Sequence, residues 1–230
     1  MGSEELLKYF KGDELAANVW FTKYAQEGEI TPVDMHLRMA KEFARVDIAF
    51  QANENRNQEG ISQYGRNRCD LSTAKIYNFF KNFKYIIPQG SVMSQLGAKS
   101  IGSLSNCLVL GTPEDSYGGI FQKDEEMAQA MKRRMGVGID LSLLRPEGVA
   151  TSNAAKSSTG AVSFMHRYSN TTREVAQNGR RGALMLSMDI NHPDILDFIK
   201  IKRDLTQVTG ANISIKLNDD FMEAVERNED

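Results

Sequence analysis

The sequence has 230 residues, of which 41% are hydrophobic and 25% charged, enough to bury a sizeable core in one or two domains. A net charge of −2 gives no general electrostatic reason to bind nucleic acid or an anionic membrane, so neither is expected as a partner. Two cysteines, Cys69 and Cys107, without a secretory leader or a long apolar run, favour a cytoplasmic protein. The three histidines, His36, His166 and His192, lack metal-ligand spacing, and no metal site is predicted.

Residues 1–84 are predicted to form a mainly helical amino-terminal region. Thr31 and Pro32 suit a helix start, and apolar residues then recur at spacings of three and four, which is typical of a helix with one buried face. These residues are Met35, Met39, Phe43, Val46 and Phe50. The polar stretch 51–70 predicts an exposed loop. Residues 71–91 predict a short helix and an apolar, strand-like run that ends at Pro88.

Residues 85–230 form the second predicted region, in which strand and helix patterns alternate. Strands are expected within residues 103–111, 137–148, 183–190 and 211–217. Helices are expected within residues 123–136, 161–170, 192–204 and 218–230, and a loop rich in Ser, Thr and Ala precedes the second of them. This alternation favours an α/β fold with mainly parallel strand pairing.

Cys107 lies inside the strand expected at 103–111. A lone cysteine in such a place is usually a small buried hydrophobe. A redox function needs a second thiol close by, and the sequence leaves a disulfide with Cys69 open.

Polar and glycine residues that suit a ligand site follow this strand. Asp115 and Ser116 lie in a turn where such groups either cap the turn or hydrogen-bond a ribose hydroxyl. Arg145 precedes Pro146 and is either a solvated side chain or a phosphate clamp. Gly136 lets the backbone approach a ligand, although its surroundings match neither a P-loop nor a dinucleotide fingerprint.

The segment from Gln177 to Gly182 contains Arg180 and Arg181 between two glycines, and it joins a predicted helix to a predicted strand. Composition alone favours an exposed basic turn. The hydrogen-bond donors and flexible glycines of this segment also suit a nucleotide-sensing loop.

Several long motifs in a fixed order carry a family resemblance. They are SLSNCLVLG, DSYGGI, KRRMGVGIDLSLLRPEG, SSTGAVSFMHRYSNTTREVAQNGRRGALM, HPDILDFIKIKRD and TGANISIKLNDDFMEAV. Together they resemble the large, catalytic subunit of ribonucleotide reductase, both in its class I form and in its adenosylcobalamin-dependent class II form. The resemblance implies a helical region followed by the first half of a ten-stranded α/β barrel, in which a cysteine thiyl radical attacks the ribose.

The resemblance also assigns roles to particular residues. Cys107 matches the catalytic, reducing cysteine on the first barrel strand. The residues that match substrate contacts are Ser91, Asn106, Gly136 and Arg181. The residues that match the specificity site for a deoxynucleotide or ATP effector are Asp115, Ser116, Arg145, Lys156, Thr159, Gln177 and Arg180. The loop 177–182 is expected to carry the identity of the effector to the substrate base, with Arg181 reaching the substrate.

The partners expected from the resemblance are a dimer of catalytic units, a thioredoxin- or glutaredoxin-type reductant and a source of the radical. That source is either a metal-containing small subunit or adenosylcobalamin, and no cofactor is assigned to this chain itself. A complete amino-terminal ATP-cone is not expected.

The Asn-x-Cys-x-Glu motif that carries the radical cysteine of the family does not occur in this sequence. We therefore expect a split or truncated catalytic subunit that is inactive alone and needs a complementary polypeptide to complete the barrel. The alternatives are a non-catalytic, nucleotide-binding regulatory module and a truncated remnant of a broken gene.

Overall fold

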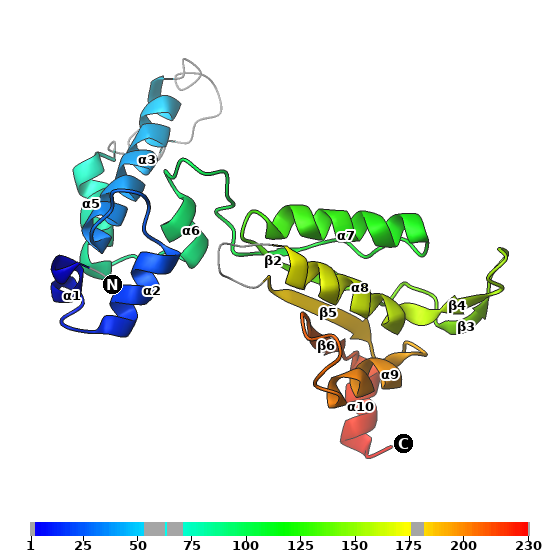
Figure 1. Ribbon diagram of the computed structural model, residues 1–230. Coiled ribbons are helices and arrows are strands. Elements are labelled where there is room, and N and C mark those ends of the chain that lie inside the picture. The colour runs from blue at the N-terminus through cyan, green and yellow to red at the C-terminus, as the bar shows by residue number, and fades with distance from the viewer. Residues whose placement is uncertain (1–2, 53–62, 64–70, 176–181, 230) are drawn as a thin grey trace. The chain divides into compact units, whose positions relative to one another are not determined.

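The computed structural model describes residues 3–52, 63, 71–175 and 182–229. The chain divides into two compact units, residues 1–104 and residues 105–230, and each is described by itself (Figure 1). Four residues named above lie outside the described ranges, as does most of the predicted loop 51–70: Cys69, Gln177, Arg180 and Arg181. None of the described helices is long and apolar enough to cross a membrane.

The first unit is helical. Its elements are α1 (Glu4–Tyr9), α2 (Glu14–Lys23), α3 (Pro32–Ala52), α5 (Thr73–Phe80), the short 3-10 helix η2 (Lys81–Phe83) and α6 (Gly90–Gln95). The side chains of Ser3, Asp13 and Ser72 each accept a hydrogen bond from a backbone N–H in the first turn of the helix that follows, which fixes where these helices begin. The largest buried side chains of this unit are Leu6, Trp20, Met35, Met39, Ile76 and Phe80.

The apolar stripe of α3 is buried only in part. Met35 and Met39 are fully buried, as predicted, whereas Phe43 and Val46 are 43% and 53% exposed. The later residues of the stripe line an apolar surface groove together with residues of α5. The side chain of Phe50 lies outside the described residues.

The strand-like run before Pro88 is not a strand, and here the prediction was wrong. The backbone N–H groups of Tyr85 and Ile86 both donate to the carbonyl oxygen of Phe79, at 3.3 and 3.1 Å. Asn82 has a left-handed backbone conformation that turns the chain back onto α5. These two N–H groups therefore bond to the preceding helix and do not enter a sheet.

Residues 85–104, which the sequence pattern grouped with the second region, lie with the first unit. Residues of α6 and Leu96 after it pack on the helical core. Arg38 of α3 donates hydrogen bonds to the carbonyl oxygens of Met93, at 2.8 Å, and of Leu96, and it forms an ion pair of 2.7 Å with Glu29. α6 is thereby held by α3.

The second unit contains a four-stranded sheet in the order β1-β2-β5-β6. Its strands are β1 (Cys107–Val109), β2 (Gly136–Asp140), β5 (Leu184–Asp189) and β6 (Asn212–Lys216). All three pairings are parallel, which confirms the predicted α/β class. A separate antiparallel hairpin, β3 (Glu147–Ala150) and β4 (Ser157–Thr159), occupies most of the stretch that the sequence pattern predicted as a loop.

The helices of this unit connect the strands. They are α7 (Tyr117–Met131), α8 (Gly160–Glu174), α9 (Ile195–Lys200) with the short 3-10 helix η3 (Ile201–Arg203), and α10 (Asp219–Arg227). Figure 1 shows α7 and α8 side by side along the sheet. α7 begins six residues before the expected helix, at Tyr117 instead of Lys123, because the hydroxyl of Ser116 accepts a hydrogen bond from the N–H of Gly119 and caps it.

The two faces of the sheet differ. One face packs against α7, α8 and α9 and forms the core, which includes Met127, Ile139, Met165, Tyr168, Leu186 and Phe198. Side chains alternate along a strand, so the next residues point to the opposite face, which is the one away from α7, α8 and α9 and which we call the helix-free face. There Cys107, Val109, Met185 and Asn212 are exposed. The helix-free face is therefore open to a ligand or to further protein.

Candidate functional site

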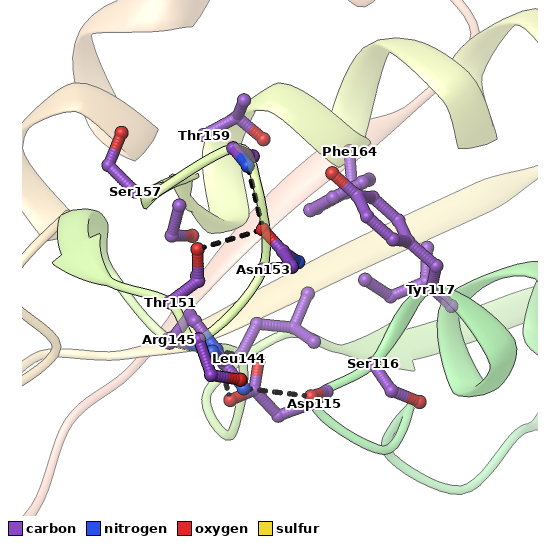
Figure 2. A pocket seen from close by; sticks show the side chains of 14 residues that line it. Asp115, Ser116, Tyr117, Leu144, Arg145, Thr151, Asn153, Ser157, Thr159 and Phe164 are labelled. Atoms are coloured by element: carbon purple, nitrogen blue, oxygen red, sulfur yellow. Dashed lines mark hydrogen bonds and ion pairs between the residues drawn. The ribbon is translucent and has the colours of Figure 1, made fainter.

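A cavity of about 270 Å³ lies where three segments of the second unit meet (Figure 2). The first segment is the turn that leads into α7. The second is residues 141–146 after β2, which we call the strap, and the third is the β3–β4 hairpin with the following helix α8. Its lining residues are Asp115, Ser116, Tyr117, Ile120, Leu144, Arg145, Thr151, Ser152, Asn153, Ala155, Ser157, Ser158, Thr159 and Phe164. We call this cavity the Arg145 pocket.

Asp115 and Arg145 join the first two segments. The Nε atom of Arg145 donates to Oδ2 of Asp115 at 2.7 Å, its NH2 nitrogen donates to the Asp115 carbonyl at 3.2 Å, and its backbone N–H donates to Oδ1 at 3.1 Å. Both side chains remain more than a third exposed. The guanidinium is thus held at the mouth of the pocket while it keeps contact with solvent.

The tip of the hairpin is ordered by Asn153. Its Oδ1 atom accepts hydrogen bonds from the Thr151 hydroxyl at 3.1 Å and from the Ala155 N–H at 3.0 Å (Figure 2). The carbonyl oxygen of Lys156 accepts from the N–H of Thr151 at 2.9 Å. These bonds close the turn after which Ser157, Ser158 and Thr159 line the pocket.

The pocket also has apolar walls. Ile120 and Leu144 are buried, and the rings of Tyr117 and Phe164 meet edge to face at a centroid distance of 6.1 Å. The Arg145 pocket therefore combines a cation, a carboxylate, several hydroxyl groups and apolar surface. This mixture suits a ligand with phosphate, sugar and base parts.

The structure brings four of the predicted effector residues together at this pocket: Asp115, Ser116, Arg145 and Thr159. Lys156 belongs to the hairpin tip, where its backbone has a φ of 63°, and it is not among the residues that line the pocket. Tyr117, Leu144, Asn153 and Phe164 were not singled out from the sequence, since their position depends on how the hairpin packs against α7 and α8.

A second group of predicted residues lies at the start of β1 and β2. Cys107 and Gly136 are register partners, and the Gly136 N–H donates to the Asn106 carbonyl at 2.7 Å. A Cβ atom on Gly136 would lie 3.5 Å from the Cys107 Sγ atom. The thiol is exposed, which argues against the interpretation of Cys107 as a buried hydrophobe.

Ser91, the remaining predicted substrate contact, lies in the first unit. It is buried in α6, where its carbonyl oxygen accepts a hydrogen bond from the Ser94 hydroxyl at 3.3 Å. Because the two units are described separately, its relation to Cys107 stays a prediction. Among the described residues no cluster of His, Cys, Asp and Glu side chains is suited to hold a metal ion.

A polar bridge spans the carboxyl ends of the strands. Lys216 of β6 donates to Oδ2 of Asp140 of β2 at 2.7 Å, across the intervening strand β5. Burial alone would raise the pKa of Asp140, but hydrogen bonds from Lys216 and Ser142 outweigh it and hold this pKa below its usual value. The bridge ties the edge strand to the centre of the sheet at the end opposite Cys107.

Comparison with known proteins gives the family. Residues 105–230 match the model of the ribonucleotide reductase barrel domain. The vitamin B12-dependent ribonucleoside-diphosphate reductase of Mycobacterium tuberculosis is 33% identical over 150 residues, which cover 64% of this chain and 21% of that protein. The ribonucleoside-diphosphate reductase large chain of Cryptosporidium parvum is 29% identical over 133 residues, which cover 55% of this chain and 17% of that protein.

A solved structure agrees in fold. The class Id ribonucleotide reductase alpha subunit of Actinobacillus ureae superposes with a TM-score of 0.70 at 18% identity, over 100% of this chain and 37% of that one. The chain spans about a fifth of the length of the curated relatives that it matches. The predicted helical region followed by part of an α/β barrel is confirmed. The chain belongs to the ribonucleotide reductase family, and its residues 105–230 match the barrel domain of the large subunit.

Proposed function

We propose that this chain forms part of the catalytic subunit of a ribonucleoside-diphosphate reductase, with Cys107 as a redox-active cysteine. The observation that carries this proposal is the place of Cys107 in a chain of this family. Its exposed thiol lies on the helix-free face of the parallel sheet, beside the gap that Gly136 leaves. A substrate ribose on this face would approach a thiol whose register partner, Gly136, has no side chain.

The reaction replaces the 2′-hydroxyl of the ribose with hydrogen, releases water and oxidises two thiols to a disulfide. Cys107 supplies one thiol, and the second thiol and the radical cysteine come from outside the described residues. The radical comes either from a metal-containing small subunit or from adenosylcobalamin, and a thioredoxin- or glutaredoxin-type protein reduces the disulfide. Diphosphates are the substrates that we favour, since the relatives are named as diphosphate reductases.

The Arg145 pocket is the proposed binding site for a deoxynucleotide or ATP effector. Arg145 is suited to contact phosphate oxygens, and the Asp115 carboxylate is suited to accept a hydrogen bond from a sugar hydroxyl. The apolar surface of Leu144 and Phe164 is suited to pack against a base.

The segment 177–182 remains the proposed link between effector and substrate, with Arg181 contacting the substrate. Different arrangements of this segment would favour different substrate bases. Arg181→Ala in the assembled enzyme should abolish the change of substrate preference with effector. A preference that still changes as in the wild type would contradict this part of the proposal.

Two exposed features suit contact with the remainder of a barrel, either from the same polypeptide or from a complementary one. Among the described residues β6 pairs with β5 alone, so its other edge is open. The apolar side of α10 is also uncovered, with Phe221, Met222 and Val225 between 37% and 57% exposed. An uncovered apolar helix face and an open strand edge are each suited to be covered by further protein.

Nucleotide titration tests the regulatory part of the proposal. The full chain, assembled with the rest of the barrel, is titrated calorimetrically with dATP, dTTP, dGTP and ATP, and with inorganic triphosphate as a control for phosphate binding alone. We expect at least one nucleotide to bind more tightly than triphosphate. Nucleotide binding without any ribonucleotide reduction would favour a non-catalytic regulatory module, and the absence of nucleotide binding would contradict the effector site.

A further inference from the structure

The turn between β5 and α9 contains two buried polar side chains that the proposed chemistry does not use. His192 is 7% exposed and Asp194 is 9% exposed. Neither residue lines the Arg145 pocket. Both nevertheless make hydrogen bonds to the segments that form its walls, 33 to 48 residues away in the sequence.

His192 holds the strap after β2. Its Nδ1 atom accepts a hydrogen bond from the Asp194 N–H at 3.0 Å, so in the neutral ring the proton is on Nε2. Nε2 lies 2.8 Å from the Leu144 carbonyl oxygen and donates to it. Leu144 lines the pocket and directly precedes Arg145, so this bond fixes the backbone from which the guanidinium extends.

Asp194 holds the hairpin and α8. Its carboxylate oxygens accept from the Glu147 N–H, at the start of β3, at 3.1 and 3.2 Å. Oδ2 also accepts from the Ala161 N–H, in the first turn of α8, at 3.1 Å. Thr159, the residue before this helix, gives no side-chain cap. A carboxylate from elsewhere in the chain therefore accepts a hydrogen bond from a free N–H group at the start of α8, where negative charge is favoured.

Gly160 shows how closely these groups approach one another. It has a φ of +79°, and a Cβ atom there would lie 2.8 Å from Oδ2 of Asp194 and 2.9 Å from the Glu147 nitrogen. No side chain fits in this space, and an L-residue would also be strained. The β5–α9 turn, the hairpin and α8 meet at this one point.

We propose that His192 and Asp194 are positioning residues for the Arg145 pocket and set its affinity for nucleotide without touching the nucleotide. The inference rests on the proposed effector site. The strap, the hairpin and α8 are three walls of the pocket, and these two side chains bond to all three. Breaking one of the bonds lets a wall move, so that its polar groups no longer converge on the ligand.

Three substitutions at these two residues and one control substitution, all in the full chain, separate this role from general folding. His192→Asn keeps an acceptor for the Asp194 N–H but cannot reach Leu144, whereas His192→Gln has an amide N–H that can. Asp194→Asn replaces one carboxylate oxygen with an NH₂ group that faces backbone donors. Asp197→Asn is the matched control, because the Asp197 carboxylate is exposed on α9 and pairs with Lys200 at 3.8 Å.

Two measurements are made on each variant: amide hydrogen exchange of the nucleotide-free chain, and calorimetric titration with the tightest-binding of dATP, dTTP, dGTP and ATP. For Asp194→Asn we expect faster exchange at Glu147 and Ala161, unchanged exchange at Leu186 in the sheet, and about tenfold weaker nucleotide binding. His192→Asn should weaken binding to a similar degree. His192→Gln and Asp197→Asn should bind as the wild type does.

The two proposals can fail separately. If the wild type binds no nucleotide, the effector site is wrong, and the exchange rates alone decide whether His192 and Asp194 hold the walls. Unchanged exchange at Glu147 and Ala161 in Asp194→Asn contradicts the positioning role. Wild-type nucleotide affinity in both His192→Asn and Asp194→Asn contradicts it too, as does a uniform rise in exchange that includes Leu186.

Discussion

The Nε atom of Arg145 donates a hydrogen bond to Oδ2 of Asp115 over 2.7 Å, between residues 30 positions apart in the sequence. Three further features surround this pair: a hairpin rich in hydroxyl groups, a buried leucine and two aromatic rings. Because both side chains are more than a third exposed, their ion pair adds little to the stability of the fold. The effect of the pair is to fix the position of the Arg145 guanidinium at the pocket.

Arg145→Ala should therefore separate binding from folding. We expect nucleotide affinity to fall about tenfold or more, because a charge-assisted contact to phosphate is lost. The free energy of unfolding should change by less than about 1 kcal/mol. Calorimetric titration and urea unfolding measure the two quantities.

Arg227→Ala is the control for Arg145→Ala. Arg227 on α10 also pairs with carboxylates, those of Glu223 and Glu229, but lies outside the pocket. Its substitution should leave nucleotide affinity unchanged. Equal losses of affinity in both variants would count against a local role for Arg145.

Gly136→Ala should shield the Cys107 thiol. The new methyl group would lie 3.5 Å from Sγ and 3.3 Å from the Cβ atom of Ala183, so it would fill the space beside the sulfur. In a Cys69→Ser background, alkylation of Cys107 by iodoacetamide should slow about threefold or more, because the approach to the thiolate is narrowed.

Gly138→Ala is the matched change two residues along the same strand. Its Cβ atom would have one neighbour within 4 Å, a Val109 methyl group at 3.8 Å. This variant should keep the wild-type alkylation rate. If Gly136→Ala also kept that rate, the gap beside Cys107 would not govern access to the thiol.

His36 should make the protein less stable in acid. It is fully buried between Phe80 and Phe83, neither ring nitrogen has a hydrogen-bond partner among the described residues, and burial lowers its pKa to about 4. In the unfolded chain the ring takes up a proton below about pH 6.5, so stability falls as the pH drops from about 6.5 to about 4. Between pH 7 and pH 5 this loss is on the order of 2 kcal/mol.

Urea unfolding at pH 7 and pH 5 measures this effect. His36→Leu should lose less stability between the two pH values than the wild type does, because the titrating group is gone. The same substitution at the exposed His166 is the control and should keep the wild-type pH dependence. Identical pH dependence in His36→Leu and the wild type would show that His36 is not responsible.

Tyr168→Phe tests the contact between α7 and α8. The buried hydroxyl of Tyr168 donates to the Ile120 carbonyl at 3.0 Å, and burial, followed by the charge of Asp124, raises the pKa of this phenol. Loss of the bond should destabilise the chain by about 1 kcal/mol. Thermal unfolding of both variants measures this loss. Tyr117→Phe, at an exposed ring, is the control and should leave the stability unchanged. Equal effects in the two variants would contradict the assignment.

The fold was largely predictable because its signals are local. Buried residues alternate along β5, and the caps of α1, α2 and α5 are single side chains close to the helix start. The hairpin was missed because its strands are short and polar. At its base the Glu147 N–H donates to the carboxylate of Asp194, which lies 47 residues further along the chain. The run at 85–87 has strand composition, but the backbone N–H groups of Tyr85 and Ile86 donate to the Phe79 carbonyl.

The candidate site was predictable only in part. Asp115, Ser116, Arg145 and Thr159 were named from the sequence and line one pocket. Leu144 and Phe164 were not named, because an apolar residue gives no signal of function until the fold shows what it faces. The positioning role proposed for His192 and Asp194 likewise rests on hydrogen bonds to Leu144, Glu147 and Ala161, which no spacing in the sequence predicts.

The most direct measurement is ribonucleotide reduction by the wild-type chain and by Cys107→Ser, each assembled with the rest of the barrel, a radical generator and a dithiol reductant. The account predicts deoxynucleotide formation with the wild type and none above background with Cys107→Ser, although both bind the effector nucleotide equally well. Wild-type turnover by Cys107→Ser would contradict the assignment of Cys107 as a redox-active cysteine.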